Sequence, residues 1–195
     1  ETLLDTVNNI LAMKVDMVVM RHPAPGACVY LASRIPANII NAGDGTHEHP
    51  TQALLDAFSI REKLGDVAGK KIAIIGDILH SRVARSDLHA LHTLGAGEIR
   101  VCGPAALLPQ DATLAGCVTG DDFDAMLEGV DAVMMLRLQR ERMEEGLVAS
   151  LDDYHARYGL TSERLRRAAR DAVVLHPGPI NRGVEITDEV ADGPQ

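Results

Sequence analysis

The chain has 195 residues, of which 46% are apolar and 24% are charged, and its formal net charge at pH 7 is -9. An acidic chain lacks the basic face that nucleic acids require, so we expect no nucleic-acid partner. No apolar stretch approaches the roughly 20 residues that cross a bilayer, and the three scattered cysteines do not suggest a disulfide framework. We therefore expect a cytoplasmic protein with no membrane partner. The chain opens without a start methionine and closes on a loop, which suggests a piece of a longer protein.

The first part of the chain alternates between helical and strand patterns, as parallel α/β layers do. Apolar residues recur at helical spacing over 1–13 and form short runs, typical of buried strands, over 16–20 and 38–41. A helix is expected over 26–33 between the two strands, and a long helix over 50–64 follows the second strand.

A glycine-rich linker over 65–69 leads into a second series of strands and helices. The expected strands cover 72–77, 98–102, 131–136 and 173–175, and the expected helices cover 81–94, 121–128, 151–158 and 162–169. This order predicts the α/β class, with two doubly wound parallel-sheet domains of which the first is truncated at its N-terminal side. We place the two domains at 1–64 and 65–195.

Three familiar kinds of site have weak support in this sequence. The first strand of the second domain ends in Gly76, but the other two glycines of a dinucleotide-binding fingerprint are missing. His47 and His49 could chelate a metal, yet no third ligand stands at a suitable spacing, and His89 and His92 have no cysteine or acidic partner. No nucleophile elbow is visible. We therefore expect no cofactor, no metal ion and no covalent intermediate.

The turn from the strand at 38–41 into the long helix brings polar side chains to a helix N-terminus. Pro50 suits the first helical position, which makes His49 the expected N-cap and puts Gln52 one turn further along on the same face. Free backbone N–H groups and the helix dipole favour an anion or a polarised carbonyl at such a place. A surface histidine at an ordinary helix start is the alternative interpretation.

Arginines stand near the ends of expected strands, where open α/β sheets bind ligands. Arg21 directly follows the strand at 16–20, and Arg82 lies near a helix start, where the dipole disfavours a cation. Arg137 and Gln139 are two residues apart, so both face the same side of an extended segment. Because an arginine can bind one carboxylate through two parallel hydrogen bonds, the pattern suits a dicarboxylate. Solvated loop arginines are the alternative interpretation.

The chain contains five dispersed motifs in a fixed order. They are Arg21-His22-Pro23, Gly43-Asp44-Gly45 followed by His49-Pro50-Thr51-Gln52, Arg82 after the first strand of the second domain, Arg137-x-Gln139, and the rigid loop His176-Pro177-Gly178-Pro179. Together they closely resemble the signature of the aspartate and ornithine carbamoyltransferases. The threonine at position 51, in place of cysteine, and the absence of cysteine from the proline-rich loop favour the aspartate branch of that family.

The resemblance implies a binding site for carbamoyl phosphate. In that site Arg21 holds the phosphate and the carbonyl oxygen, His49 donates to the carbonyl oxygen, and Gln52 accepts from the carbamoyl NH2. Backbone carbonyls of the loop around Gly178 and Pro179 accept hydrogen bonds from the amino groups of the substrates. Arg21 and His49 are the candidate catalytic residues.

For the second substrate, the resemblance implies that Arg82 and Arg137 clamp the two carboxylates of L-aspartate, with Gln139 in support. The implied reaction transfers the carbamoyl group to the aspartate amine and gives N-carbamoyl-L-aspartate and phosphate, a step of pyrimidine synthesis that needs no cofactor. We expect the two domains to close on the substrates, with hinges near 41–45 and 65–69.

The resemblance further implies a homotrimer with shared active sites, in some assemblies with regulatory or dihydroorotase partners. The family also has a Ser-x-Arg-Thr phosphate loop, a lysine loop from a neighbouring subunit and a C-terminal helix, and none of these is in this sequence. Two alternatives remain open. One is a catalytically silent family member that serves as a scaffold or binding subunit, and the other is a carbamoyltransferase for another amino acid.

Overall fold

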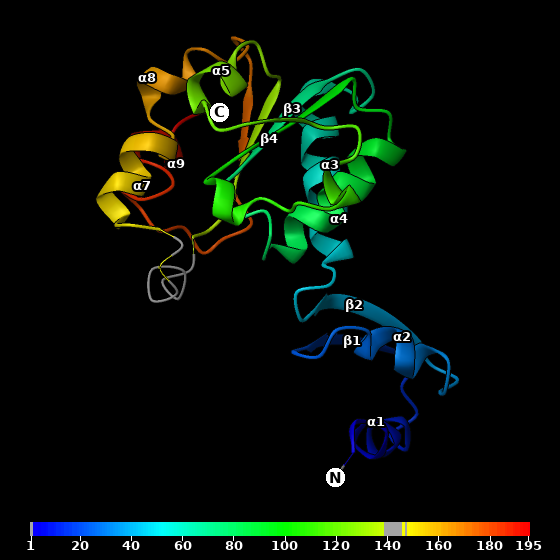
Figure 1. Ribbon diagram of the computed structural model, residues 1–195. Coiled ribbons are helices and arrows are strands. Elements are labelled where there is room, and N and C mark those ends of the chain that lie inside the picture. The colour runs from blue at the N-terminus through cyan, green and yellow to red at the C-terminus, as the bar shows by residue number, and fades with distance from the viewer. Residues whose placement is uncertain (1, 139–145, 147) are drawn as a thin grey trace.

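The structure, a computed structural model, describes residues 2–138, 146 and 148–195. It contains two parallel sheets of unequal size, and the smaller one lies below the larger one in Figure 1. The predicted α/β class with parallel sheets is confirmed. The N-terminus lies at the far end of the smaller sheet and the C-terminus lies beside the larger one (Figure 1).

The smaller sheet pairs β1 (Met17–His22) with β2 (Asn38–Asp44) in parallel. The crossover between the two strands is α2 (Ala27–Ala32), and α1 (Leu3–Leu11) precedes them. Thr2 caps α1 through a capping box with Asp5, so the helix starts where the sequence supplies a side-chain acceptor. A small apolar core joins the two helices to the strands; its buried members are Val7, Met20, Ala27, Cys28 and Leu31.

The larger sheet has the strand order β5-β4-β3-β6-β7, and every neighbouring pair in it is parallel. Its strands are β3 (Lys71–Ile75), β4 (Glu98–Cys102), β5 (Val118–Gly120), β6 (Ala132–Met135) and β7 (Val173–Leu175). The helical segments that accompany it are α3 (Pro50–Leu64), α4 (Arg82–Thr93), α5 (Phe123–Leu127), α7 (Leu151–Tyr158), α8 (Ser162–Leu165) and α9 (Asp188–Ala191), with short 3-10 turns η1 (Ala105–Leu107) and η2 (Ala112–Leu114).

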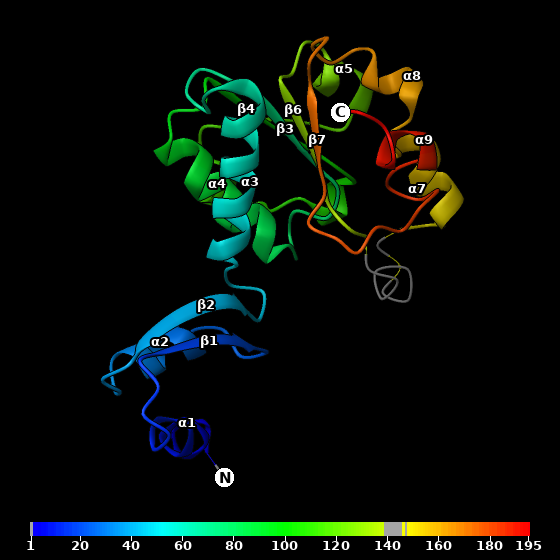
Figure 2. The same ribbon diagram turned by 180° about the vertical axis from the view of Figure 1, so that it is seen from behind.

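Helices cover both faces of the larger sheet (Figures 1 and 2). Along β3 successive side chains point to opposite faces, so Ile72 and Ile74 join one apolar core while Ala73 and Ile75 join the other. The first core includes side chains of α3 and α4, and the second includes side chains of α5, α7, α8 and α9. The sequence of a strand that is buried on both faces is an unbroken apolar run. It lacks the alternation of polar and apolar residues by which a half-buried strand is recognised.

Helix α3 links the two sheets. Its first residues follow the end of β2, and its body packs beside α4, where Ala57 and Ile60 are buried in the core of the larger sheet (Figure 2). Helix α3 therefore makes most of its contacts with the second part of the chain. The division into domains at residues 64 and 65 stays a prediction.

Several expected elements differ from the observed ones at their ends. The helix expected over 162–169 stops at Leu165, because Arg167 and Ala168 bond to carbonyls three residues back and close turns instead of a further α-helical turn. The strand expected over 38–41 runs on to Asp44. Strand β5 and helix α9 were not expected from the sequence. Within the described residues, no helix has the length and apolar character needed to span a membrane.

Two leucines on the same helix give a direct test of this core. Leu91 of α4 is 2% exposed in the core of the larger sheet, whereas Leu94, at the end of that helix, is 45% exposed. Leu91→Ala should lower the free energy of unfolding by about 2–5 kcal/mol, since it leaves a cavity, and Leu94→Ala should lower it by less than about 1 kcal/mol. Urea denaturation of both variants measures the difference, and equal losses would contradict the described packing.

Candidate active site

A cavity of about 360 Å³ lies where the N-terminus of α3 meets the carboxyl ends of strands from both sheets. It contains all the site residues expected from the sequence that the structure describes. Its lining residues are Arg21, Gly45, Thr46, His49, Gln52, Asp77, His80, Ser81, Arg82, Val83, Leu136, Arg137, Pro177, Gly178 and Pro179. Gln139, the remaining expected site residue, lies outside the described residues.

The topology of the fold explains why residues so far apart in sequence meet. Arg21 belongs to β1, Arg82 begins the helix after β3, Arg137 follows β6, and the loop at 177–179 follows β7. Because parallel strands end at one edge of a sheet, their following loops gather at that edge. The cavity therefore draws one wall from the smaller sheet and the others from the larger sheet and α3.

His49 is the N-cap of α3, as expected. Its Nδ1 accepts the backbone N–H of Gln52 at 3.3 Å, and its own backbone N–H donates to Ser86 Oγ at 2.9 Å. Because Nδ1 is an acceptor, the neutral ring carries its proton on Nε2 and has that N–H available as a donor. Burial, together with the positive charges of Arg82 and Arg21, lowers the pKa of His49. The site thus favours a neutral imidazole that donates.

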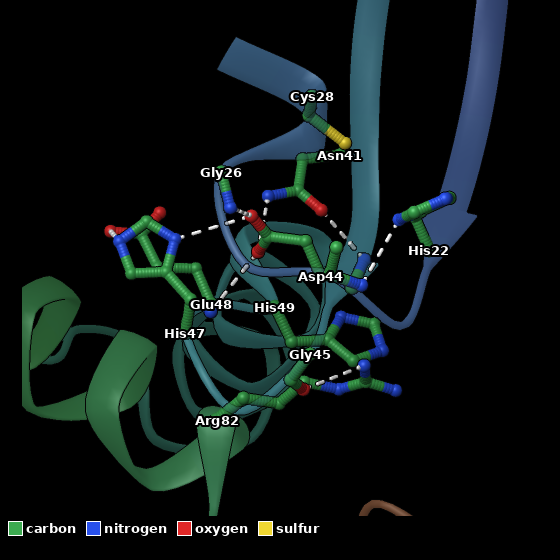
Figure 3. A network of polar contacts seen from close by, with 12 residues as sticks. His22, Gly26, Cys28, Asn41, Asp44, Gly45, His47, Glu48, His49 and Arg82 are labelled. Carbon is green, nitrogen blue, oxygen red and sulfur yellow. Dashed lines mark hydrogen bonds and ion pairs between the residues drawn. The ribbon is translucent and has the colours of Figure 1, made fainter. Parts of the chain in front are cut away.

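Arg82 is held against the turn that follows β2 (Figure 3). Its Nη1 donates to the carbonyl of Gly45 at 3.1 Å. Gly43 has a φ of +117°, and a Cβ there would lie 2.8 Å from Cζ of Arg82. A side chain at position 43 would therefore both strain the backbone and displace the guanidinium. Burial and the charge of Arg21 lower the pKa of Arg82, against the opposing effect of Asp44.

A buried carboxylate organises this turn. Asp44 is fully buried and accepts hydrogen bonds from the backbone N–H of Gly26 at 2.7 Å, the side-chain amide of Asn41 at 3.0 Å and the backbone N–H of Glu48 at 3.2 Å (Figure 3). His47 Nδ1 lies 3.2 Å from it. Burial alone would raise the pKa of Asp44, but these hydrogen bonds outweigh burial and lower it. The carboxylate ties α2, β2 and the start of α3 together.

Two other arginines at the cavity are available for ligands. Arg21 and Arg137 are both exposed, and neither guanidinium makes a hydrogen bond to the part of the chain that the structure describes. With Arg82 they give the cavity three guanidinium groups within an acidic chain. Guanidinium groups match the planar oxygens of carboxylates and phosphates, so the cavity suits an anionic ligand.

The proline-rich loop at the cavity is fixed by His176. The Nδ1 of this histidine accepts the backbone N–H of Gly178 at 2.9 Å, so Nε2 carries the proton and donates to Glu185 at 3.1 Å. The same Glu185 oxygen accepts the backbone N–H of Asn181 at 2.8 Å. The peptide bond between Gly178 and Pro179 is cis. These contacts hold Gly178 and Pro179 at the cavity wall.

Sequence reasoning missed two titratable residues that line the cavity. Asp77 follows the carboxyl end of β3, and its Oδ1 lies 2.8 Å from Nδ1 of His80. The rule that selected Arg21, a polar residue just past a parallel strand, applies equally to Asp77 and could have found it. Within the described residues, no group of three or more histidine, cysteine, aspartate or glutamate side chains is placed to hold a metal ion.

The chain matches two family models that together cover most of its length. The model of the aspartate/ornithine carbamoyltransferase Asp/Orn-binding domain matches residues 68–195, and that of the carbamoyl-P-binding domain of the same family matches residues 1–62. The chain belongs to the aspartate/ornithine carbamoyltransferase family. The family predicted from the five motifs is thereby confirmed.

Curated relatives carry the name of one branch of this carbamoyltransferase family. The aspartate carbamoyltransferase catalytic subunits of Stenotrophomonas maltophilia K279a and of Xanthomonas campestris pv. campestris B100 are each 67% identical over 198 residues. The match covers the whole of this chain and 63% of each relative. The chain therefore spans about 63% of the length of the curated relatives it matches.

Solved carbamoyltransferase structures share the fold. Aspartate transcarbamoylase from Trypanosoma cruzi, in complex with carbamoyl aspartate and phosphate, matches with a TM-score of 0.82 and 32% identity, covering all of this chain and 62% of that one. Ornithine carbamoyltransferase from Pyrococcus furiosus matches with a TM-score of 0.83 and 25% identity, over all of this chain and 64% of that one. The fold is thus common to both branches, and the sequence lies nearer to the aspartate branch.

The protonation of His49 can be tested without substrate. Because its pKa is lowered, its NMR titration midpoint should lie below the ordinary value of about 6.5, and Arg82→Gln should raise that midpoint by removing one of the repelling charges. Folded His49 binds its proton less readily than unfolded His49. Its contribution to stability is therefore complete above pH 6.5 and is lost as the pH falls below that value.

The matched control for this titration is Arg61→Gln, which removes a cation from the last turn of α3, at the other end of the helix. That variant should leave the His49 midpoint unchanged. A midpoint at or above the ordinary value, or one insensitive to Arg82→Gln, would contradict the described electrostatics of the cavity.

Proposed function

We propose that this chain carries the transfer of the carbamoyl group of carbamoyl phosphate to the amine of L-aspartate, giving N-carbamoyl-L-aspartate and phosphate in pyrimidine synthesis. The observation that carries the proposal is one cavity lined by Arg21, His49, Arg82 and Arg137, which come from both parts of the chain. Support from relatives comes from 67% identical proteins named aspartate carbamoyltransferase catalytic subunits.

Carbamoyl phosphate fits the side of the cavity formed by Arg21 and the start of α3. The amine attacks the carbonyl carbon, a negative charge develops on the carbonyl oxygen and the new C–N bond forms. The C–O bond to phosphate then breaks, and one proton of the attacking amine passes to the departing phosphate. A neutral His49 that donates through Nε2 stabilises that developing charge, and the guanidinium of Arg21 stabilises both it and the departing phosphate. Fixed donors of this kind need no reorganisation during the reaction.

The hydrogen bonds of the carbamoyl NH2 are assigned to acceptors on the wall of the cavity. Gln52 lines the cavity one turn after His49, and its amide oxygen can accept one N–H of the carbamoyl group. Backbone carbonyls around Gly178 and Pro179, fixed through His176, accept the remaining amino hydrogens. These contacts orient the carbonyl carbon toward the attacking amine, and orientation alone can supply several kcal/mol of the barrier reduction.

Two arginines on the larger sheet select the amino acid. Arg82 and Arg137 each offer a planar fork for one carboxylate, so together they suit L-aspartate rather than a cationic side chain such as that of ornithine. Gln139 is assigned a supporting contact. Arg82 begins α4 and Arg137 follows β6, so the distance between their guanidinium groups sets the length of the dicarboxylate that fits.

We extend the proposal to assembly and location. The protein forms a homotrimer in which neighbouring subunits complete each other's sites, with regulatory or dihydroorotase subunits as further partners, and it works in the cytoplasm. The acidic composition and the absence of a disulfide pattern in the sequence support the location. The protein uses no cofactor, since a polarised carbonyl and a good leaving group need only fixed charges and donors.

His49→Ala should lower kcat by roughly a hundredfold or more, because it removes one donor to the developing oxyanion. The measurement is formation of carbamoyl aspartate from labelled carbamoyl phosphate by the natural full-length protein. His89→Ala, on an exposed position of α4, is the matched control and should keep normal activity. A fall in kcat of less than tenfold for His49→Ala would contradict the role assigned to this residue.

Inhibition identifies the amino-acid substrate. Succinate keeps both carboxylates of aspartate but lacks the amine, so it should compete with L-aspartate, and Arg137→Gln should weaken that competition at least tenfold. L-Ornithine should neither compete nor become carbamoylated. A natural protein that folds, assembles and forms no carbamoyl aspartate would instead support a silent scaffold, and carbamoylation of another amino acid would replace the assigned substrate.

A further inference from the structure

A pair of buried acids lies behind Gln52. The side-chain nitrogen of Gln52 donates to both oxygens of Asp56, at 3.1 and 3.2 Å, within helix α3. Asp56 is 6% exposed, and Asp87 on the neighbouring helix α4 is 1% exposed. Helices α3 and α4 pack against each other, and the pKa of each of these two carboxyl groups depends on the other. The pair therefore sits between the cavity wall and the core.

The pair has too few compensating groups to carry two charges. Neither oxygen of Asp87 has a hydrogen-bond donor among the described residues, and no ion pair in that part of the chain includes Asp56 or Asp87. Two buried carboxylates without a cation repel each other strongly. A single proton resolves this, because a protonated carboxyl of Asp87 can donate to an ionised Asp56.

The pKa shifts of Asp56 and Asp87 agree with one proton shared by the two carboxyl groups. Burial raises the pKa of Asp56 to about 6, against the lowering effect of Gln52. Burial and the charge of Asp56 raise the pKa of Asp87 to about 9. Because Gln52 donates to both oxygens of Asp56, the negative charge of the pair belongs on Asp56 and the shared proton on Asp87.

An ionised Asp56 determines which way the Gln52 amide faces. A carboxylate only accepts hydrogen bonds, so it selects the NH2 end of the amide and leaves the amide oxygen free to turn toward the cavity. We propose that Asp56, itself held by Asp87, is a positioning residue that fixes the Gln52 oxygen as the acceptor for the carbamoyl NH2. This inference rests on the proposed function, because it explains how that site distinguishes an amide from other carbonyl groups.

Two stable analogues isolate this hydrogen bond. Phosphonoacetamide keeps the carbamoyl NH2 of the substrate, while acetonylphosphonate has a methyl group in its place and keeps the carbonyl and the phosphonate. The natural full-length protein should bind phosphonoacetamide more tightly, since only that analogue donates to Gln52. Isothermal titration calorimetry with each analogue gives the ratio of affinities, and the ratio cancels any general change in phosphonate binding.

Asp56→Asn should reduce this ratio roughly tenfold, because an asparagine can accept or donate and no longer selects one end of the Gln52 amide. Gln52→Ala should reduce it similarly. The double variant Gln52→Ala/Asp56→Asn should show no further loss, since Asp56 acts through Gln52. Asp152→Asn, an exposed carboxyl on α7, is the matched control and should keep the ratio of the unmodified protein.

A pH series tests the role of Asp87. Above about pH 9 its proton is lost, and repulsion between the two buried charges should displace Asp56 from the Gln52 amide, so the affinity ratio of the unmodified protein should fall. Asp87→Asn still donates to Asp56 but cannot ionise, so its ratio should stay constant through the same range. This comparison remains decisive if Asp56→Asn does not fold.

The outcomes separate this inference from the proposed function. Formation of carbamoyl aspartate by the unmodified protein, with an unchanged affinity ratio in Asp56→Asn, overturns the positioning role alone. Equal weakening of both analogues in Asp56→Asn, or additive losses in the double variant, also overturns it, because either result indicates a merely structural role. A folded protein that binds neither analogue and forms no product overturns the proposed function, and the positioning role falls with it.

Discussion

The buried carboxylate of Asp44 is the contact on which the geometry of the site depends. It holds the end of β2, the start of α2 and the turn into α3 through hydrogen bonds from Asn41, Gly26 and Glu48. A carboxylate with so many donors keeps its charge in a buried place, and that charge in turn favours the nearby Arg82 guanidinium. The turn held in this way presents the carbonyl of Gly45, which accepts a hydrogen bond from Arg82 Nη1 at 3.1 Å.

The same turn decides the chemistry of His49. As the N-cap of α3, this residue uses one ring nitrogen to accept a backbone N–H, which leaves only the other nitrogen as a donor. Burial and the charges of Arg82 and Arg21 then lower the pKa of His49, which disfavours a charged ring. The three arginines give the cavity a positive charge that suits an anionic ligand, while the neutral histidine can supply a directed hydrogen bond. The positive charge of the cavity and the directed hydrogen bond are thus provided by different residues.

The fold class could be predicted from the sequence for physical reasons, whereas most of the candidate site residues were predicted by combining such reasons with the resemblance to a known family. Apolar runs mark the strands of a parallel sheet, Pro50 marks a helix start, and polar residues just past strand ends mark a ligand site. Strand β5 was not predicted, because it has only three residues and its sequence shows no clear apolar run or alternation. The contact between Asp56 and Asp87 was not predicted either, since periodicity places each on a helix but does not say which helices become neighbours.

Because the body of α3 is packed into the core of the larger sheet, His49 and Gln52 are attached to the same part of the fold as Arg82 and Arg137. Arg21 stands on the other sheet, and the backbone that joins the two is the short turn after β2. The shape of that turn, which Asp44 holds, therefore sets the separation of Arg21 from the remaining groups of the cavity. The side chains assigned to the carbamoyl amide and to the dicarboxylate therefore lie on one part of the fold, whereas the contacts assigned to Arg21, with the phosphate and the carbonyl oxygen, depend on the shape of that turn.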